Sequence, residues 1–289
     1  MDMERPIVGI GEILFDLLPA GAQLGGAPAN FAYHVNQLGG NGVAVSAIGK
    51  DVLGEEVKTI LSDKGLKAIL PEVDCPTGVV NVTLDGKGVP TYTIIEGVAW
   101  DNVPYTPEMK ALAAEAQAVC FGTLAQRGAV TRQTILDFIA DMPADSLKVY
   151  DINLRQHFYS KEVIETSLRV ADILKINDEE ILVVAGLLGL DGSPEEACRA
   201  ILRLYGLRLV ILTKGGDGSE VITESEVLSV ACPTVKIADT VGAGDSFTAA
   251  FIRAYLRGDT LAECHRLANE VSAYVCSCHG AMPPYGRTF

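Results

Sequence analysis

Three small residues followed by an aspartate are the feature of this sequence with the clearest chemistry. Gly242, Ala243 and Gly244 run directly into Asp245 and then into an apolar, helix-forming stretch, in the segment DTVGAGDSFTAAF. Glycines let a backbone approach a ligand closely, and the free N–H groups at a helix start carry a partial positive charge. The segment therefore predicts an anion site whose carboxylate takes a proton from a hydroxyl that attacks the anion, as in phosphoryl transfer to an alcohol.

The same residues also have a purely structural interpretation, because aspartate is common at helix starts and Gly-Ala-Gly is common in tight turns. A second segment, GGAPANFAYHVNQLGG from Gly25 to Gly40, is likewise rich in small residues. Within it, Asn30 carries an amide that both donates and accepts hydrogen bonds, which suits sugar hydroxyls but is also typical of a helix cap. The two segments together favour the chemical interpretation.

Apolar runs that alternate with helical segments must position these residues. The expected strands span residues 7–10, 43–48, 118–121, 148–152, 173–176 and 207–212. This alternation is typical of an α/β protein with a mostly parallel sheet that helices cover. Residues 77–100 break the pattern, because GVVNVTL and TYTIIEG flank the turn sequence DGKG as in a hairpin. With a strand-like run at 13–18, this hairpin predicts a small antiparallel sheet that projects from the core.

Length, composition and charge fit one globular enzyme. A chain of 289 residues with 48% hydrophobic residues buries roughly three quarters of its unfolded surface in an α/β core. The sequence has no apolar run of membrane-spanning length, and its start is too acidic for a signal peptide, so we expect a soluble protein of the cytoplasm. The net charge of −14 and the pI near 4.7 argue against nucleic acid or an anionic membrane as a partner.

Other nucleotide and metal motifs are missing. Gly9 and Gly11 follow a strand, but Leu14 stands at the third glycine position of a dinucleotide-binding fingerprint. Gly-Lys-Ser and Gly-Lys-Thr do not occur, which excludes a Walker A loop. The run CSCH at 276–279 has no second ligand pair at zinc-site spacing, so the seven cysteines are expected to be free thiols.

The two glycine-rich segments, and the order of the elements between them, resemble the ribokinase/PfkB family of carbohydrate kinases over essentially the whole chain. The phrases GEILFDLLP, FGTLAQR, DINLRQHFYS and KINDEE are most similar to those of bacterial-type fructokinases. The resemblance implies a ribokinase-like, three-layer α/β/α core with a small antiparallel β lid over the sugar. We therefore expect one kinase domain over residues 1–289, with the lid formed by about 12–24 and 75–101.

The resemblance also implies roles for single residues. Asp245 is the base for the sugar hydroxyl, and the Gly-Ala-Gly backbone before it stabilises the transferring phosphoryl group. Arg155 in DINLR suits the γ-phosphate, because a guanidinium forks onto phosphate oxygens, although a surface ion pair is the alternative. The residues implied for the floor of the sugar pocket are Asp16, Gly26 and Asn30.

ATP and Mg²⁺ are the implied cofactors. Asn177 and Glu180 in NDEE match an Asn-x-x-Glu motif that organises Mg²⁺ and phosphate through water, but an ordinary capped helix start has the same pattern. Asp239 matches a position that helps hold a monovalent cation such as K⁺ in the resembled family. The alternative is a structural role, in which its carboxylate accepts hydrogen bonds from N–H groups of a turn. Pro284 falls where relatives ring that ion, which leaves potassium dependence open. The residues implied for the nucleotide are Asn177, Thr213, Gly215, Gly216, Gly218 and Asn269.

We expect an ATP-dependent kinase that phosphorylates a primary hydroxyl of a monosaccharide, with D-fructose as substrate and fructose 6-phosphate as product. The alternatives are the same chemistry on 2-keto-3-deoxygluconate or ribose, and a catalytically silent sugar-binding regulator. A sugar acid needs a cation, yet residues 77–100 contain only Lys87, which leaves Arg127 and Arg155 and favours a neutral sugar. The expected partners are sugar and ATP, and the apolar-edged lid must cover either the substrate or, in a homodimer through the lid, another subunit.

Overall fold

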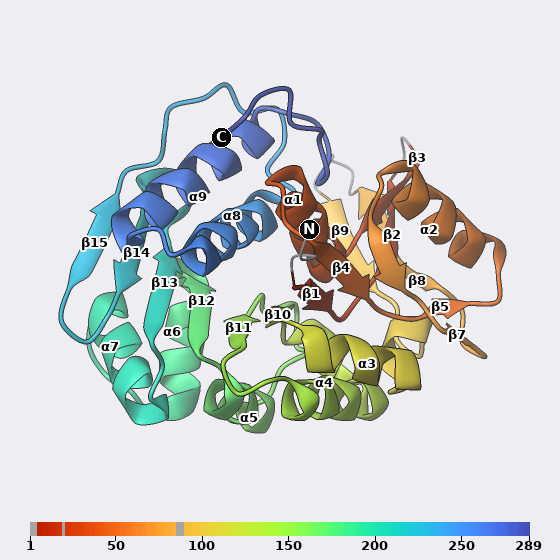
Figure 1. Ribbon diagram of the computed structural model, residues 1–289, viewed down its shortest axis with the longest axis horizontal. Coiled ribbons are helices and arrows are strands. Elements are labelled where there is room, and N and C mark those ends of the chain that lie inside the picture. Colours follow the sequence, from red (N-terminus) through yellow and green to blue (C-terminus); the bar gives the residue numbers. More distant parts are fainter. Residues whose placement is uncertain (1–4, 19–20, 85–89) are drawn as a thin grey trace.

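Parallel strands form the centre of the molecule, of which the computed structural model describes residues 5–18, 21–84 and 90–289 (Figure 1). The main sheet has the order β15-β14-β13-β12-β11-β10-β1-β4-β6. Its strands pair in parallel from β6 to β13, and β14 and β15 extend it as antiparallel strands. These strands are β1 (Ile7–Ile10), β4 (Gly42–Val45), β6 (Lys67–Ile69), β10 (Ala118–Phe121), β11 (Leu147–Asp151), β12 (Ile173–Asn177), β13 (Leu209–Thr213), β14 (Ser219–Ile222) and β15 (Val227–Val230).

Helices cover both faces of this sheet and give the expected three layers (Figure 1). One face carries α1 (Ala27–Gln37), α8 (Ala243–Arg257) and α9 (Leu261–Cys276). The other face carries α3 (Pro107–Glu115), α4 (Ala129–Asp141), α5 (Lys161–Val170), α6 (Asp178–Leu188) and α7 (Pro194–Tyr205). Because both faces are buried, the central strands are almost continuous apolar runs, which is why the sequence predicted them well.

Local signals in the sequence set the helix ends. At the start of α7, the Ser193 hydroxyl accepts a hydrogen bond from the Glu196 N–H, and the Glu196 carboxylate accepts one from the Ser193 N–H. The helix ends at Gly206, which has the left-handed φ of 67° that glycine tolerates. The close approach of α1 to β1 depends on Gly9, because a Cβ there would lie 2.1 Å from the Pro28 carbonyl oxygen.

The expected strand at 43–48 is two strands. β4 ends at Val45 within the main sheet, and β5 (Ile48–Gly49) pairs instead with β7 (Glu72–Val73). The chain leaves the main sheet between them and turns into α2 (Val52–Asp63), which begins at the N-cap Asp51. The apolar run alone therefore predicted the extended conformation but not the change of partner.

The small sheet expected beside the core is present, with the order β3-β2-β8-β9. Its strands are β2 (Leu14–Leu18), β3 (Gly21–Gly25), β8 (Gly78–Leu84) and β9 (Pro90–Ile94). The β8–β9 and β2–β3 pairs are antiparallel, but the central β2–β8 pair is parallel, unlike the expectation. More than fifty residues separate β2 from β8 along the chain, and such a long connection permits parallel pairing. The turn predicted at 85–88 lies outside the described residues.

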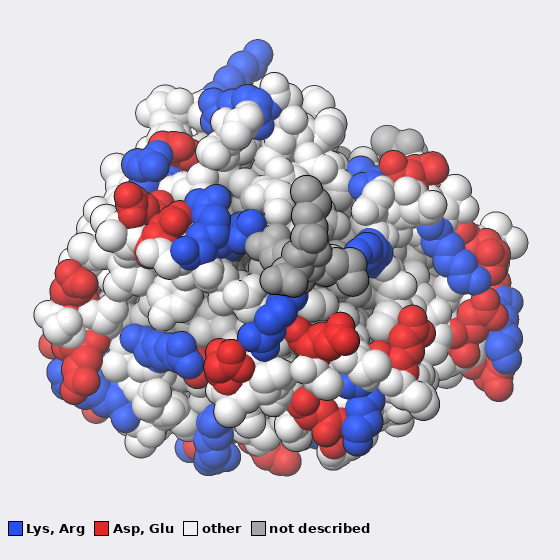
Figure 2. All heavy atoms as spheres, in the orientation of Figure 1, with Lys and Arg blue, Asp and Glu red and all other residues white. Residues whose placement is uncertain are grey.

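Short elements complete the fold, namely the 3₁₀ helices η1 (Ala99–Asn102), η2 (Leu124–Arg127) and η3 (Gly215–Asp217). On the face drawn in Figure 2, Lys and Arg side chains are interspersed with Asp and Glu side chains. None of the helices in the described ranges is both long and apolar enough to cross a membrane.

Candidate active site

A cavity of about 870 Å³ collects most of the predicted site residues. It lies where β11, β12 and β13 end, beside the small sheet and the starts of α1, α6 and α8. Ligands of open α/β sheets bind at this edge, because the carboxyl ends of parallel strands and the N-termini of the following helices meet there. The predicted residues that line the cavity are Asp16, Gly26, Asn30, Arg155, Asn177, Glu180, Thr213, Gly215, Gly218, Gly242, Ala243, Gly244, Asp245 and Asn269.

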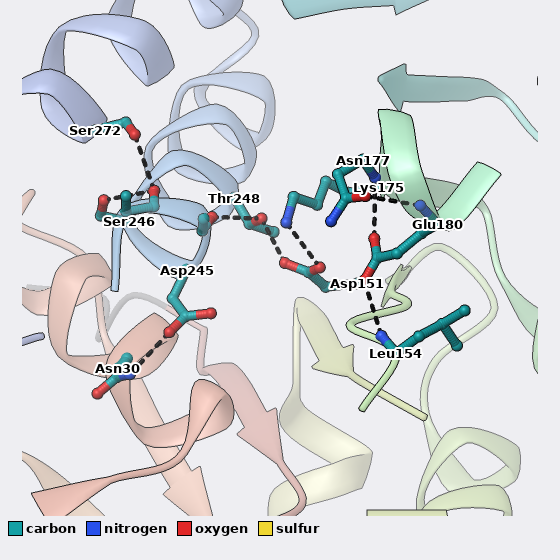
Figure 3. Close-up of polar contacts among 12 residues, drawn as sticks. Asn30, Asp151, Leu154, Lys175, Asn177, Glu180, Asp245, Ser246, Thr248 and Ser272 are labelled. Atoms are coloured by element: carbon teal, nitrogen blue, oxygen red, sulfur yellow. Dashed lines mark hydrogen bonds and ion pairs between the residues drawn. The ribbon is translucent and has the colours of Figure 1, made fainter. Parts of the chain in front are cut away.

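Asp245 projects from the first turn of α8 toward α1 (Figure 3). Its Oδ2 accepts a hydrogen bond of 2.8 Å from the Asn30 amide nitrogen. The helix starts at Gly242, which has a left-handed φ of 78°, and the hydroxyls of Ser246 and Ser272 both donate to the Ala243 carbonyl. As at any helix start, the first N–H groups have no partner within the helix, so the predicted anion site and its carboxylate lie together.

The surroundings of Asp245 raise its pKa to about 6. Burial is the main cause, and the negative charge of Asp151 adds to it. The hydrogen bond from Asn30 and the positive charges of Lys175 and Arg155 act in the opposite direction. A carboxylate with this pKa is mostly ionised at neutral pH and is a stronger base than an ordinary aspartate.

The residues predicted for the sugar pocket, Asp16, Gly26 and Asn30, line the part of the cavity beside the small sheet. Asp16 is half-buried on β2, and burial raises its pKa while the charge of Arg155 lowers it. Asn30 is buried, and its Oδ1 has no hydrogen-bond partner among the described residues. A buried acceptor without a partner is costly, so the amide has capacity for a ligand hydroxyl.

Glu12 is a site residue that the sequence analysis missed. It lines the cavity, is 4% exposed, and its Oε2 has no partner among the described residues. Burial raises its pKa to about 7, the nearby charge of Asp245 contributes to the rise, and Arg155 opposes it. The signal in the sequence was a single charged residue inside the apolar run GIGEILF.

Asn177 and Glu180 form the capped helix start that was one of their two interpretations. The Asn177 Oδ1 accepts from the N–H groups of Glu179 and Glu180, and the Glu180 carboxylate accepts from the N–H groups of Asn177 and Leu154 (Figure 3). Burial raises the pKa of Glu180, and the positive charge of Lys175 opposes this rise. Asp178 and Glu179 are exposed at the same corner of the cavity.

Arg155 lies in the loop after β11, between two residues with positive φ, Asn153 at 44° and Gln156 at 49°. Its Nη1 donates to the Leu154 carbonyl, and the Gln156 amide donates to the Tyr92 carbonyl on β9 at 2.7 Å. The loop thus bridges the main sheet and the small sheet, and Arg155 stands at the cavity between them.

A buried ion pair below the start of α8 is the second feature that the sequence analysis missed. The Lys175 Nζ lies 3.1 Å from the Asp151 Oδ1, and the Thr248 hydroxyl donates to the Asp151 Oδ2 at 2.8 Å (Figure 3). Burial pulls the pKa of Lys175 down, but the carboxylates of Asp151, Glu180 and Asp245 outweigh burial and leave the pKa raised. Asp151 begins the segment DINLR and Lys175 begins KINDEE, but the pairing of strands β11 and β12 is what brings the two side chains together.

Thr213, Gly215 and Gly218 line the cavity at the end of β13, whereas Gly216 of the same turn is not among the lining residues. The Asn269 amide is buried and is committed to Ser219 and to the His265 carbonyl. The part of the cavity predicted to bind the nucleotide is therefore lined by a glycine-rich turn after β13 and by Asn269 on α9.

Asp239 lies outside the cavity lining, in the loop after β15. Its carboxylate accepts hydrogen bonds from the N–H groups of Val241 and Gly280. This arrangement is the turn-bonding alternative considered for it. The Pro284 carbonyl accepts a hydrogen bond from the Tyr274 hydroxyl.

Arg127 is committed to the protein interior. Its guanidinium is 7% exposed, pairs with Asp101 at 2.8 Å, and lies over the rings of Trp100 and Phe158 at 4.0 and 4.4 Å. It also donates to the Ile95 carbonyl. Among the cavity-lining residues in the described ranges, the basic side chains are Arg155 and Lys175.

A helix N-terminus with an adjacent carboxylate of raised pKa, facing the Asn30 amide at the edge of a parallel sheet, fits a phosphotransferase with an alcohol as acceptor. The model of the pfkB family of carbohydrate kinases matches residues 21–286, and the chain belongs to this family. Its fold is ribokinase-like, as inferred from the sequence.

Named relatives cover nearly the whole chain. Fructokinase-2 of Solanum lycopersicum is 28% identical, over 94% of this chain and 88% of that protein. The ATP-dependent 6-phosphofructokinase of Thermoanaerobacterium thermosaccharolyticum is 28% identical, over 97% and 91%. The crystal structure of an uncharacterized sugar kinase from Pyrococcus horikoshii in complex with ATP has a TM-score of 0.81 and 29% identity, and covers 96% of this chain and 94% of that chain. All three are named as kinases of a sugar or a sugar phosphate, and their names do not give one common substrate.

Proposed function

We propose that the protein is an ATP-dependent fructokinase that converts D-fructose to fructose 6-phosphate. The observation that carries the proposal is the position of Asp245, which stands at a helix start in a cavity with a sugar-type amide on one side and a glycine-rich turn on the other. The fructokinase among the relatives supports the choice of sugar.

In the proposed reaction, Asp245 takes the proton of the primary hydroxyl as that oxygen forms a bond to the γ-phosphorus of ATP. The bond from this phosphorus to the bridging oxygen breaks, and ADP leaves with the electron pair. The N–H groups at the start of α8 and the Arg155 guanidinium stabilise the charge on the phosphoryl oxygens. The pKa of about 6 for Asp245 leaves it ionised at neutral pH and able to accept the proton.

The acidic corner at the start of α6 fits Mg²⁺ that keeps part of its water shell. Asn177 and Glu180 use their side-chain oxygens in the helix cap, whereas Asp178 and Glu179 are exposed and line the cavity beside them. Oxygen donors that contact the ion largely through water are typical for Mg²⁺ in phosphoryl-transfer enzymes. A bound Mg²⁺ would neutralise charge on the ATP phosphates. The ATP-bound relative supports ATP as the donor.

The cavity favours a neutral sugar over a sugar acid. Arg127, one of the two arginines considered for a carboxylate, is buried against Asp101 and does not line the cavity. Arg155 is assigned to the phosphate, and Lys175 is paired with Asp151. A sugar carboxylate would instead lie near Asp16 and Asp245, where like charges repel it.

We also propose that the small sheet is the lid over the sugar. Val80 and Ile94, from β8 and β9, line the cavity together with Asp16 on β2. Closure of such a sheet would exclude water from the γ-phosphate and suppress ATP hydrolysis.

A coupled assay that detects ADP, run with fructose, ribose and 2-keto-3-deoxygluconate, tests the proposed function. We expect kcat/KM for fructose to exceed that for the acid by at least about tenfold, or roughly 1.4 kcal/mol of discrimination. Equal or faster turnover of the acid would reject fructose but keep the sugar kinase. Absence of turnover with every sugar, with intact sugar binding, would instead indicate a silent sugar-binding protein.

A further inference from the structure

Lys175 is a buried ammonium at the edge of the phosphate site, and the proposed reaction does not yet use it. The residue is 8% exposed on β12 and lines the cavity. A Cβ built on Gly244 would lie 3.0 Å from the Lys175 Nζ, and among the described residues outside this stretch of α8 Lys175 is its one neighbour within 4 Å. The ammonium therefore borders the backbone turn that begins α8 (Figure 3).

The Lys175 ammonium has more N–H donors than it has acceptors among the described residues. An ammonium has three N–H donors, and in the described part of the chain one of them has an acceptor, the Asp151 Oδ1 at 3.1 Å. Buried donors without acceptors are costly, and they lie where the cavity meets the helix start. The geometry requires an acceptor from the ligand or from water at this point.

Two elements hold the ammonium in place. The second oxygen of Asp151 accepts from the Thr248 hydroxyl, and Thr248 lies one turn after Gly244 on α8. Thr248 Oγ1 also lies 3.0 Å from the Gly244 carbonyl oxygen. Asp151 therefore connects β11, β12 and the start of α8, so that Lys175 and the helix N–H groups keep a fixed relative position.

We infer that Lys175 is a further catalytic residue, whose ammonium contacts the γ-phosphoryl oxygens from below the start of α8, and that Asp151 is its positioning residue. This inference rests on the proposed kinase function and deepens it. Lys175 keeps its three protons throughout, because Asp245 takes the hydroxyl proton and ADP takes the electron pair of the broken P–O bond. Its contribution is fixed positive charge where negative charge develops.

A purely structural ion pair is the competing explanation, since Lys175 also neutralises a buried aspartate. In that case, removing both charges together would restore what removing one destroys. If the ammonium is catalytic, removing both charges can restore folding but cannot restore kcat. The double variant Lys175→Met/Asp151→Leu therefore separates the two explanations, and its thermal unfolding reports whether the core has recovered.

The test measures kcat, KM and nucleotide affinity for Lys175→Met, for the double variant and for Lys148→Met as the matched control. Lys148 is a partly buried lysine on the neighbouring strand β11, paired with Asp172 away from the cavity. We expect both Lys175 variants to lose at least about 100-fold in kcat, with the KM for the sugar changed less than about threefold. The control should keep its kcat. A double variant that regains folding and wild-type kcat, or a Lys175→Met variant within about threefold of wild type, would overturn the inference.

A binding measurement decides the question independently of turnover. Titration with ATP and with ADP in the presence of Mg²⁺ gives the ratio of the two affinities, which isolates the γ-phosphate. Lys175→Met should reduce the preference for ATP over ADP by at least about tenfold, and Lys175→Arg should restore part of it. An unchanged ratio would refute the contact even if no sugar were turned over, whereas a wild type inactive on every sugar would refute only the proposed function.

Discussion

Replacement of Glu12 by glutamine should stabilise the protein in a pH-dependent way. Burial raises the pKa of this carboxyl from 4.5 to about 7, so the folded protein holds a proton that the unfolded chain releases at a lower pH. Folding stability must then fall as the pH rises from about 4.5 to 7, and the full penalty remains above pH 7. At roughly 1.4 kcal/mol per unit, the shift corresponds to about 3 kcal/mol.

Glutamine has nearly the same shape and no charge, so Glu12→Gln should be more stable than the wild type by up to about 3 kcal/mol at pH 8. At pH 5 the difference in the free energy of unfolding should shrink to less than about 1 kcal/mol, because Glu12 of the folded wild type is then mostly protonated and as neutral as the glutamine. Urea unfolding followed by fluorescence of Trp100, the single tryptophan and a fully buried one, measures these values.

Glu224→Gln provides the control, because Glu224 is exposed in the turn between β14 and β15. Its free energy of unfolding should match that of the wild type within about 0.5 kcal/mol at both pH values. A Glu12→Gln variant that is less stable at pH 8, or whose effect does not change between pH 5 and 8, would refute the explanation by burial of a charge.

Three further predictions follow from the site. The kcat/KM of the wild type should fall about tenfold per pH unit below pH 6, because Asp245 with a pKa of about 6 must be ionised to act as a base; a flat profile down to pH 5 would contradict this. Asp101→Asn should lower the free energy of unfolding by about 3–5 kcal/mol, because Arg127 would keep a buried charge without a partner, while the exposed Glu162→Gln should change it by less than about 0.5 kcal/mol in the same urea experiment. Replacing residues 79–96 by a short Gly/Ser link should raise the KM for fructose at least about tenfold and leave the KM for ATP nearly unchanged; preserved sugar affinity would show that the small sheet is not the lid, and sedimentation of the same variant would test the predicted dimer.

The parts of the fold that the sequence predicted are those with local causes. The buried parallel strands are almost continuous apolar runs, and the helix that starts after Asn177 carries its own capping residue. The division of residues 43–48 into β4 and β5 was not predicted, because the run is apolar except for Ser46 and the partner strands decide where it leaves the sheet. The parallel β2–β8 pairing likewise depends on the path of the chain between them.

The site shows the same division. Asp245 and Asn30 were predicted because their glycine-rich neighbours mark them, and their hydrogen bond joins residues far apart in sequence. Lys175 and Glu12 were missed, since a lone charged residue in an apolar run reads as an interruption until strand order places it at the cavity. Arg127 was left open as a ligand for a carboxylate, and only its packing against Asp101 shows that the protein itself neutralises it.

The most direct test of phosphoryl transfer at the start of α8 is the kcat of Asp245→Asn with fructose and ATP. Asparagine keeps the size of the side chain but cannot accept a proton, so we expect normal folding, near-normal ATP affinity and a kcat about 10²- to 10⁴-fold below the wild type. Asp63→Asn, at the exposed end of α2, should retain the wild-type kcat. A kcat of Asp245→Asn close to that of the wild type would remove Asp245 from the mechanism and contradict the account of the site.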